Sequence, residues 1–238
     1  MVVRTNLDDR IVDVTARLGE TFDLVESSMN QSIKDLHDIS LRRKLKTEEK
    51  RKKMRTSSQE ISQDLLLILT LNSPLLQDLR IIIAFLRCVD SLDRITTYQR
   101  QITSALQKWS DIVEDDSTLP EDYLAQSLSN FDCVCEMREL VKSALISSEP
   151  MKVGNIAKLW KDTQSSYDEI QNLLLEESES KVLGKLGRMQ LAKVSKYIER
   201  TGYEYNRIAS NWYFAINNEW VVIDELDDFE LTCESPFS

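Results

Sequence analysis

The feature that most constrains the fold of this chain is an apolar stripe with helical spacing that occurs twice. In residues 73–106, apolar side chains recur at intervals of three, four or seven positions, the spacing of one buried face of a long helix. The pattern returns in residues 184–215. Placing Asp93-Arg94 over Glu199-Arg200, a shift of 106 residues, aligns the two stretches. The sequence therefore predicts a tandem duplication of a helical unit that ends in its longest helix.

The rest of the chain also favours helices. Glycine (5) and proline (4) are scarce, Asn-Gly and Asp-Gly hairpin dipeptides are absent, and no run alternates as a strand would. The expected fold class is all-α, with six helices forming two tandem, pseudo-symmetric three-helix bundles. Pro74 is expected in the first turn of the third helix, and Thr118 and Glu121 are expected to form a capping box for the fourth. The predicted helices span residues 6–38, 40–71, 73–106, 118–147, 156–174 and 184–215.

The joint between the two halves is predicted at the acidic stretch 111–120. The expected domains are a first three-helix repeat over residues 1–112, a second over 113–219, and an acidic tail over 220–238. The sequence leaves open whether the start of the tail packs back onto the bundle or makes contacts in trans. An exposed cluster of Trp212, Tyr213 and Trp220 would indicate a dimer face, and a close-packed one would be core.

Composition excludes several functions. A net charge of −10 disfavours nucleic-acid binding, and no apolar run approaches the length of a membrane span. The four cysteines lack paired metal spacing, and His37 is the single histidine, which disfavours zinc. His37 is expected to have only a structural role near a helix end. No nucleophile elbow and no second histidine are present, so we expect a non-enzymatic cytoplasmic protein with reduced cysteines.

The charge is unevenly distributed. Residues 42–55 hold nine basic and two acidic residues, a net +7, which leaves −17 for the remainder. One interpretation is a solvated helix end beside acidic neighbours. The alternative is a docking surface for an acidic partner or an anionic membrane face. The residues hypothesised to dock a partner are Lys50, Arg51 and Lys53.

The third predicted helix resembles the signature of the PhoU family, regulators of phosphate uptake. That signature is loosely Q-P-x-x-x-D-L-R, an apolar run, then D-L-E-R-I-G-D. The second half keeps Glu199, Arg200 and Gly202 of the E-R-x-G-D element. The six-helix duplicated layout is also similar to that family. The signature residues matched here are Pro74, Asp78, Leu79, Arg80, Leu92, Asp93, Arg94 and Ile95.

The resemblance implies metal clusters held by E/D-x-x-x-D motifs on the second and third helices of each half. Residues four apart share a helix face, so such carboxylates converge on hard cations. Here Asp93 is followed at the motif position by Thr97, and Lys52 and Thr56 stand near the other expected acids. Our hypothesis is that Lys52 or Arg55 lies opposite Asp93, near Asp90, and supplies the charge of the missing metal.

In the second half the carboxylates Asp168 and Glu199 remain, with Gln164 at the other motif position. They predict at most a weakly bound divalent metal (Mg, Fe or Zn), and Mg²⁺ would keep several waters there. The alternative is that Glu199 pairs with Arg200 or with a neighbouring helix.

The function that the resemblance implies is regulation of phosphate transport or phosphate signalling through protein contacts. The implied partners are a phosphate ABC transporter component, a signalling kinase or equivalents, together with a second copy of the chain, with no nucleic acid and peripheral membrane contact at most. The alternatives are a scaffold that kept the fold without phosphate signalling, and a metal-cluster-binding helical protein.

Overall fold

The computed structural model describes residues 2–38, 47–72, 74–113 and 118–226. Within these ranges the chain is helical and contains no β-strand, so the predicted all-α class is confirmed. None of the described helices is both long and apolar enough to cross a bilayer. The elements are α1 (Val2–His37), α3 (Thr47–Asn72), α4 (Gln77–Val113), α5 (Glu121–Ser147), α6 (Val153–Leu175), α7 (Glu177–Asn217) and the 3₁₀ turn η1 (Ile223–Glu225).

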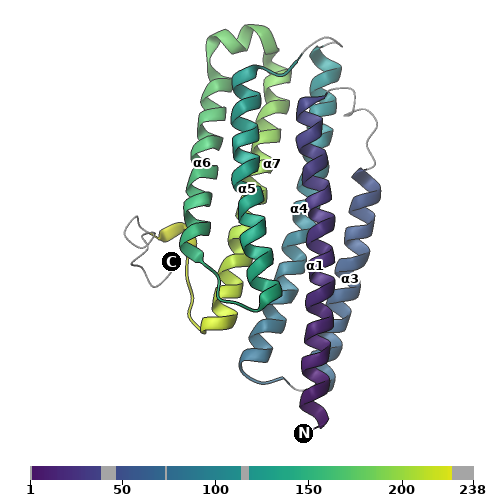
Figure 1. The fold of residues 1–238 in the computed structure, drawn as a ribbon. Helices are drawn as coiled ribbons and strands as arrows, with labels where there is room; N and C mark the ends of the chain where they lie inside the picture. The colour runs from purple at the N-terminus through teal and green to yellow at the C-terminus, as the bar shows by residue number, and fades with distance from the viewer. Residues whose placement is uncertain (1, 39–46, 73, 114–117, 227–238) are drawn as a thin grey trace.

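The six long helices form two groups of three that lie side by side (Figure 1). Helices α1, α3 and α4 pack on one another, and so do α5, α6 and α7. The predicted apolar stripes face the interior, where Phe22, Leu92, Ile156 and Ile198 are fully buried. The buried apolar side chains of both groups form one continuous core. The proposed repeat boundaries stay a prediction.

The two groups meet mainly along α4 and α7, which run antiparallel and form the most extensive helix pair in the molecule (Figure 1). Phe85 stacks on Trp212 with ring centroids 5.6 Å apart, and further along α4 the Gln99 amide donates to Thr201 Oγ1 at 3.1 Å. The helices therefore cross close to Ile95 and Thr201. The 106-residue shift makes these two residues equivalent. A twofold axis that relates α4 to α7 would place equivalent residues at the point where the two helices cross.

The structure corrects several predicted helix ends. Pro74 precedes α4 instead of lying in its first turn, because the turn passes through Leu76 at a positive φ of 49° before the helix begins at Gln77. Pro120 is the N-cap of α5 and no side chain caps that helix, so the capping box of Thr118 and Glu121 is wrong. The gap between the predicted helices 156–174 and 184–215 is also wrong, because α7 begins at Glu177.

The break that the sequence placed at Gly184 is present inside α7. Gly184 has φ 60° and ψ 168°, and a regular helix continues from there to Asn217. Glycine adopts this left-handed backbone without the steric cost of a Cβ atom. The long sixth helix was therefore predicted at the correct residue, although a further short helical stretch precedes it.

The described part of the C-terminal tail packs back onto the bundle. Val221, Ile223 and Leu226 are buried, and η1 contacts α6. Trp220 is largely exposed, but its ring stacks on Phe214 with centroids 4.0 Å apart. Residues 227–238 lie outside the described residues.

Candidate functional site

The signature carboxylate Asp93 lines a cleft between α3 and α4. The cleft has a volume of about 490 Å³ and is lined mostly by polar residues, with Arg55 contributed by α3 and Asp90 by α4. Apolar residues of both helices, such as Ile61 and Leu92, are fully buried beneath it. The remaining lining residues are Ser58, Gln59, Ser62, Gln63 and Leu66.

Burial raises the pKa of the Asp93 carboxyl, and the positive charges of Arg55 and Arg51 oppose that rise. The neighbouring carboxylate Asp90 acts in the same direction as burial, while Arg94 lowers the pKa of Asp93. The arginines therefore offset only part of the desolvation of this partly buried carboxylate. Arg55 thus occupies the place that we hypothesised for the cation opposite Asp93.

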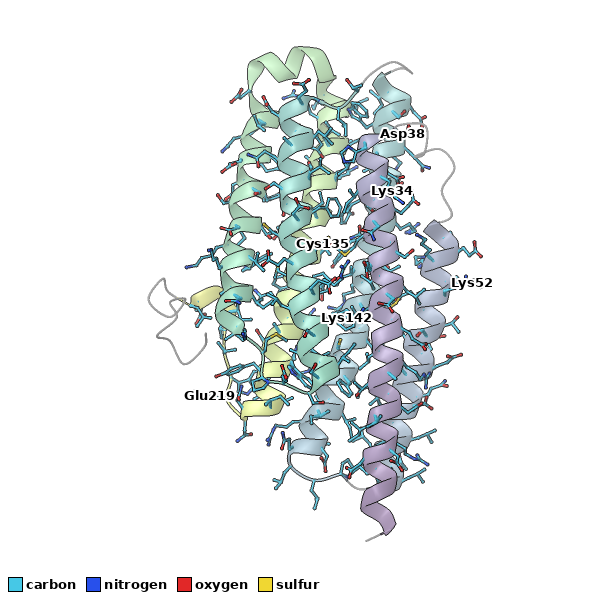
Figure 2. The ribbon with its side chains drawn as sticks, in the orientation of Figure 1. Lys34, Asp38, Lys52, Cys135, Lys142 and Glu219 are labelled. Atoms are coloured by element: carbon cyan, nitrogen blue, oxygen red, sulfur yellow. The ribbon has the colours of Figure 1, made fainter. Side chains whose placement is uncertain are left out.

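Lys52, the other residue of that hypothesis, lies elsewhere. It lines a second groove of about 470 Å³ on α3, together with Glu49, Lys53 and Ser57. Figure 2 shows Lys52 at the outer edge of α3, pointing away from the bundle. Lys52 and Arg55 are three positions apart, and the two grooves lie on different flanks of the same helix.

Glu199, the counterpart of Asp93 in the second half, also lies beside a cation. Its carboxylate forms an ion pair with Lys196, one turn earlier on α7, at 3.0 Å. Arg200 Nε lies 3.7 Å from the same carboxylate. The ammonium of Lys196 also lies 4.8 Å from the centre of the Tyr167 ring on α6. Both signature carboxylates are therefore neighbours of cationic side chains.

Asp168, the second predicted metal ligand, is exposed on α6, whereas Glu199 is almost fully buried. Across the described residues, no three His, Cys, Asp or Glu side chains come together as a metal site would require. The donor set around each signature carboxylate thus contains cations where a metal cluster would need further oxygen ligands. The residues present do not fit the multinuclear cluster that the family signature implies.

Arg94 joins the two halves of the molecule. Its guanidinium lies 3.5 Å from the carboxylate of Glu204 on α7, which is 3% exposed. The same carboxylate pairs with Arg207 at 3.0 Å and accepts a hydrogen bond from the Tyr98 hydroxyl at 3.4 Å. A buried carboxylate needs such partners, so this cluster fixes the register of α4 against α7.

The other signature pair, Asp78 and Arg80, lies at one end of the seam between α4 and α7. Asp78 is in the first turn of α4, where a negative charge is favoured by the helix dipole. Arg80 Nε donates to the carbonyl of Ala215 at 3.2 Å, near the C-terminus of α7. In this structure the Asp-Leu-Arg element therefore begins one long helix and ties it to the end of the other.

The three hypothesised docking residues differ in how accessible their charged groups are to a partner. Lys50 donates to the Ser27 carbonyl at 2.8 Å, and burial lowers the pKa of its ammonium. Arg51 donates three hydrogen bonds to Glu48, the shortest 2.8 Å. Lys53 is exposed and lines the groove with Lys52. Residues 42–46 of the basic segment lie outside the described residues.

Sequence reasoning missed two buried polar residues. Asp35 is fully buried in α1, where it accepts hydrogen bonds from Gln31 at 2.9 Å and Thr103 at 3.1 Å. Arg138 is 5% exposed on α5 and pairs with Glu26 on α1 at 3.5 Å. For Arg138 the signal was a lone charge on an otherwise apolar helix face, which identifies a buried group but not its partner. Asp35 follows the polar residues Gln31 and Ser32, so its burial had no such signal.

Fold and site together define an all-α protein of two packed three-helix bundles whose signature charges are satisfied within the chain. Residues 18–106 match the PhoU domain family. The whole fold is similar to the phosphate transport system regulatory protein PhoU from Streptococcus pneumoniae, with TM-score 0.78 at 15% identity, covering 91% of this chain and 99% of that one. It is also similar to PhoU from Pseudomonas aeruginosa, with TM-score 0.77 at 17% identity, covering 89% and 99%.

No curated protein sequence matches the chain significantly. The chain therefore carries a PhoU domain match over residues 18–106, as its signature predicted, and it shares the fold of solved PhoU proteins over most of its length. It departs from the metal-binding pattern of the signature, because its signature carboxylates lie beside side-chain cations.

Proposed function

We propose that this protein is a non-enzymatic regulator of phosphate transport or phosphate signalling that acts in the cytoplasm through protein contacts, as a homodimer. The observation that carries the proposal is the PhoU domain over residues 18–106 within a complete PhoU fold. The partners that fit are a phosphate ABC transporter component, a signalling kinase or equivalents. The described surface offers two clefts and a basic helix face where a protein partner fits.

The contact surface that we propose for an acidic partner is the groove on α3 lined by Lys52 and Lys53. Both lysines are exposed, and Thr56 and Ser57 add hydroxyl groups beside them. Glu49 and Glu60 also line the groove. The described residues 47–55 around it nevertheless hold five basic and two acidic side chains, and in a molecule of net charge −10 this excess attracts acidic surfaces. Lys50 and Arg51 support the groove through their bonds to α1 and Glu48.

Affinity purification of the tagged protein from its host, grown in low and in high phosphate, tests the proposal. We expect a transporter or kinase component to co-purify to an extent that depends on phosphate. The double variant Lys52→Glu, Lys53→Glu should reduce this capture. The matched control, Lys158→Glu with Lys193→Glu, makes the same charge change at exposed positions of α6 and α7. Equal capture by both double variants would count against the α3 groove.

A second candidate function is a helical scaffold that kept the fold without phosphate signalling. The cations beside Asp93 and Glu199 favour it, because they show a departure from the metal-binding pattern of the signature. Deletion of the gene should alter the rate of radiolabelled phosphate uptake if the regulatory proposal holds. Unaltered uptake, with no phosphate-dependent partner, would establish the scaffold instead.

A further inference from the structure

The turn between α3 and α4 exposes a set of aliphatic side chains that the regulatory proposal does not use. From residue 65 to residue 77 the sequence LLLILTLNSPLLQ has no charge, in a chain where 29% of residues are charged. Leu65 and Ile68 are buried, but most of their neighbours are not. We call the exposed set the leucine turn: Leu66 (55%), Leu67 (52%), Leu71 (63%), Leu75 (74%), Leu76 (80%), Leu79 (38%) and Ile83 (39%).

Leu76 is the most exposed of these side chains and has the least favourable backbone. Its φ of 49° is in the left-handed region, where glycine or asparagine is tolerated and leucine is disfavoured. At 80% exposure, the Leu76 side chain gains little from packing within its own chain. A strained apolar residue that does not stabilise the monomer indicates a contact outside it.

The leucine turn has the size of an interface core. At about 100 Å² of apolar surface for an exposed Leu or Ile side chain, the seven exposed fractions correspond to roughly 400 Å². That area is at the scale of the largest apolar patches of monomeric proteins, which are often interaction sites. It is also about half of the roughly 800 Å² that each partner contributes to a standard interface, and a polar rim supplies the remainder.

We propose that the leucine turn is the surface through which two copies of this chain associate. Interfaces between different, transient partners are no more apolar than the rest of a protein surface, whereas homodimer interfaces are distinctly more apolar and poor in charge. The part of the turn from residue 65 to residue 77 carries no charge, so it also pairs with itself without bringing like charges together, as a twofold interface requires. Elsewhere, two copies of net charge −10 repel each other.

Other surfaces fit a dimer or a lipid surface less well. Trp212 and Tyr213 are buried in the core, so the aromatic cluster near the C-terminus is not a dimer face. A lipid surface is disfavoured because interfacial segments carry basic residues beside their apolar face, and this turn carries none between residues 65 and 77. The leucine turn lies at one end of the bundle, away from the turn between α6 and α7 (Figure 1).

The test is the oligomeric state of the full chain, measured by light scattering and sedimentation at about 1 to 100 µM. The wild type should be a dimer. The variant Leu75→Ser, Leu76→Asn should raise the dimer Kd at least about tenfold. Asparagine is tolerated at positive φ, so this variant should fold as well as the wild type, which thermal unfolding checks. The control is Leu175→Ser, because Leu175 is 75% exposed at the opposite end of the bundle and should leave the dimer intact.

Added NaCl should preserve or tighten the dimer, because salt screens the repulsion between two acidic chains and does not weaken apolar contacts. A monomeric wild type, a dimer unaffected by Leu75→Ser, Leu76→Asn, or equal disruption by Leu175→Ser would each overturn the proposal. Flotation of a monomeric wild type with phosphatidylcholine vesicles would assign the turn to a bilayer instead. The inference rests on the proposed homodimer alone. If the protein dimerises through the leucine turn but deletion of its gene leaves phosphate uptake unaltered, the dimer interface is supported and the regulatory role is refuted.

Discussion

Replacing Gly202 by alanine tests how closely the signature motif of the second half packs on its neighbouring helix. Alanine stabilises a helix interior by about 1 kcal/mol relative to glycine. At Gly202, however, the added Cβ would lie 3.2 Å from Thr163 Cγ2 and 3.3 Å from Trp160 Cζ3. Both neighbours are buried on α6, and overpacking of this kind costs about 1–3 kcal/mol. The net expectation is a loss of about 1 kcal/mol in the free energy of unfolding.

Gly19→Ala is the matched control for this prediction. Gly19 is also buried inside a long helix, but its added Cβ would meet only Ile146 Cδ1 at 3.1 Å. Ile146 is 42% exposed and its terminal methyl can move toward solvent, so Gly19→Ala should stabilise the protein by about 0.5–1 kcal/mol. Urea unfolding followed by circular dichroism should separate the two variants by about 2 kcal/mol. A Gly202→Ala protein as stable as the wild type would refute the close α6–α7 packing.

Three further predictions concern the charged groups. Glu204→Gln should destabilise the protein by about 1–3 kcal/mol in urea unfolding, because it weakens the buried partner of two arginines, while Glu48→Gln at the surface should change nothing measurable. Burial raises the pKa of Asp93, so folding favours its protonated form and this contribution to stability is lost as the pH rises above about 4. Asp93→Asn should therefore gain stability relative to the wild type between pH 4 and pH 7, and a relative loss over that range would contradict the raised pKa. Dialysis against EDTA should shift Tm by less than about 1 °C, and a stoichiometric metal cluster held by first-half residues in elemental analysis would show this wrong.

The helical stripes were predictable because their periodicity is a local property of the sequence. Residues 184–215 were predicted to carry a buried stripe, and Val194 and Ile198 within it are buried. The helix ends were less predictable. A capping side chain competes with the groups that the tertiary structure places beside the helix end, and the expected capping box of Thr118 and Glu121 does not form at α5.

The site was only partly predictable for a related reason. Arg55 was one of two cations proposed for the place opposite Asp93, because periodicity alone does not fix which flank of α3 faces α4. Glu204 interrupts an apolar face, but its partners Arg94 and Tyr98 come from the other half of the chain, more than a hundred residues away. The leucine turn is likewise exposed because no other described helix covers it. Its uncharged sequence alone does not reveal this.

The crossing of α4 and α7 has a consequence for how an ancestral repeat would evolve. Two identical chains related by a twofold would have to place the same side chain on both sides of that crossing. In this single chain Tyr98 donates to Glu204, residues exactly one repeat length apart at 106 positions. Covalent joining of the halves thus permits a hydroxyl to face a carboxylate where symmetry would have forced carboxylate against carboxylate, and the two arginines Arg94 and Arg207 then need to balance a single buried charge.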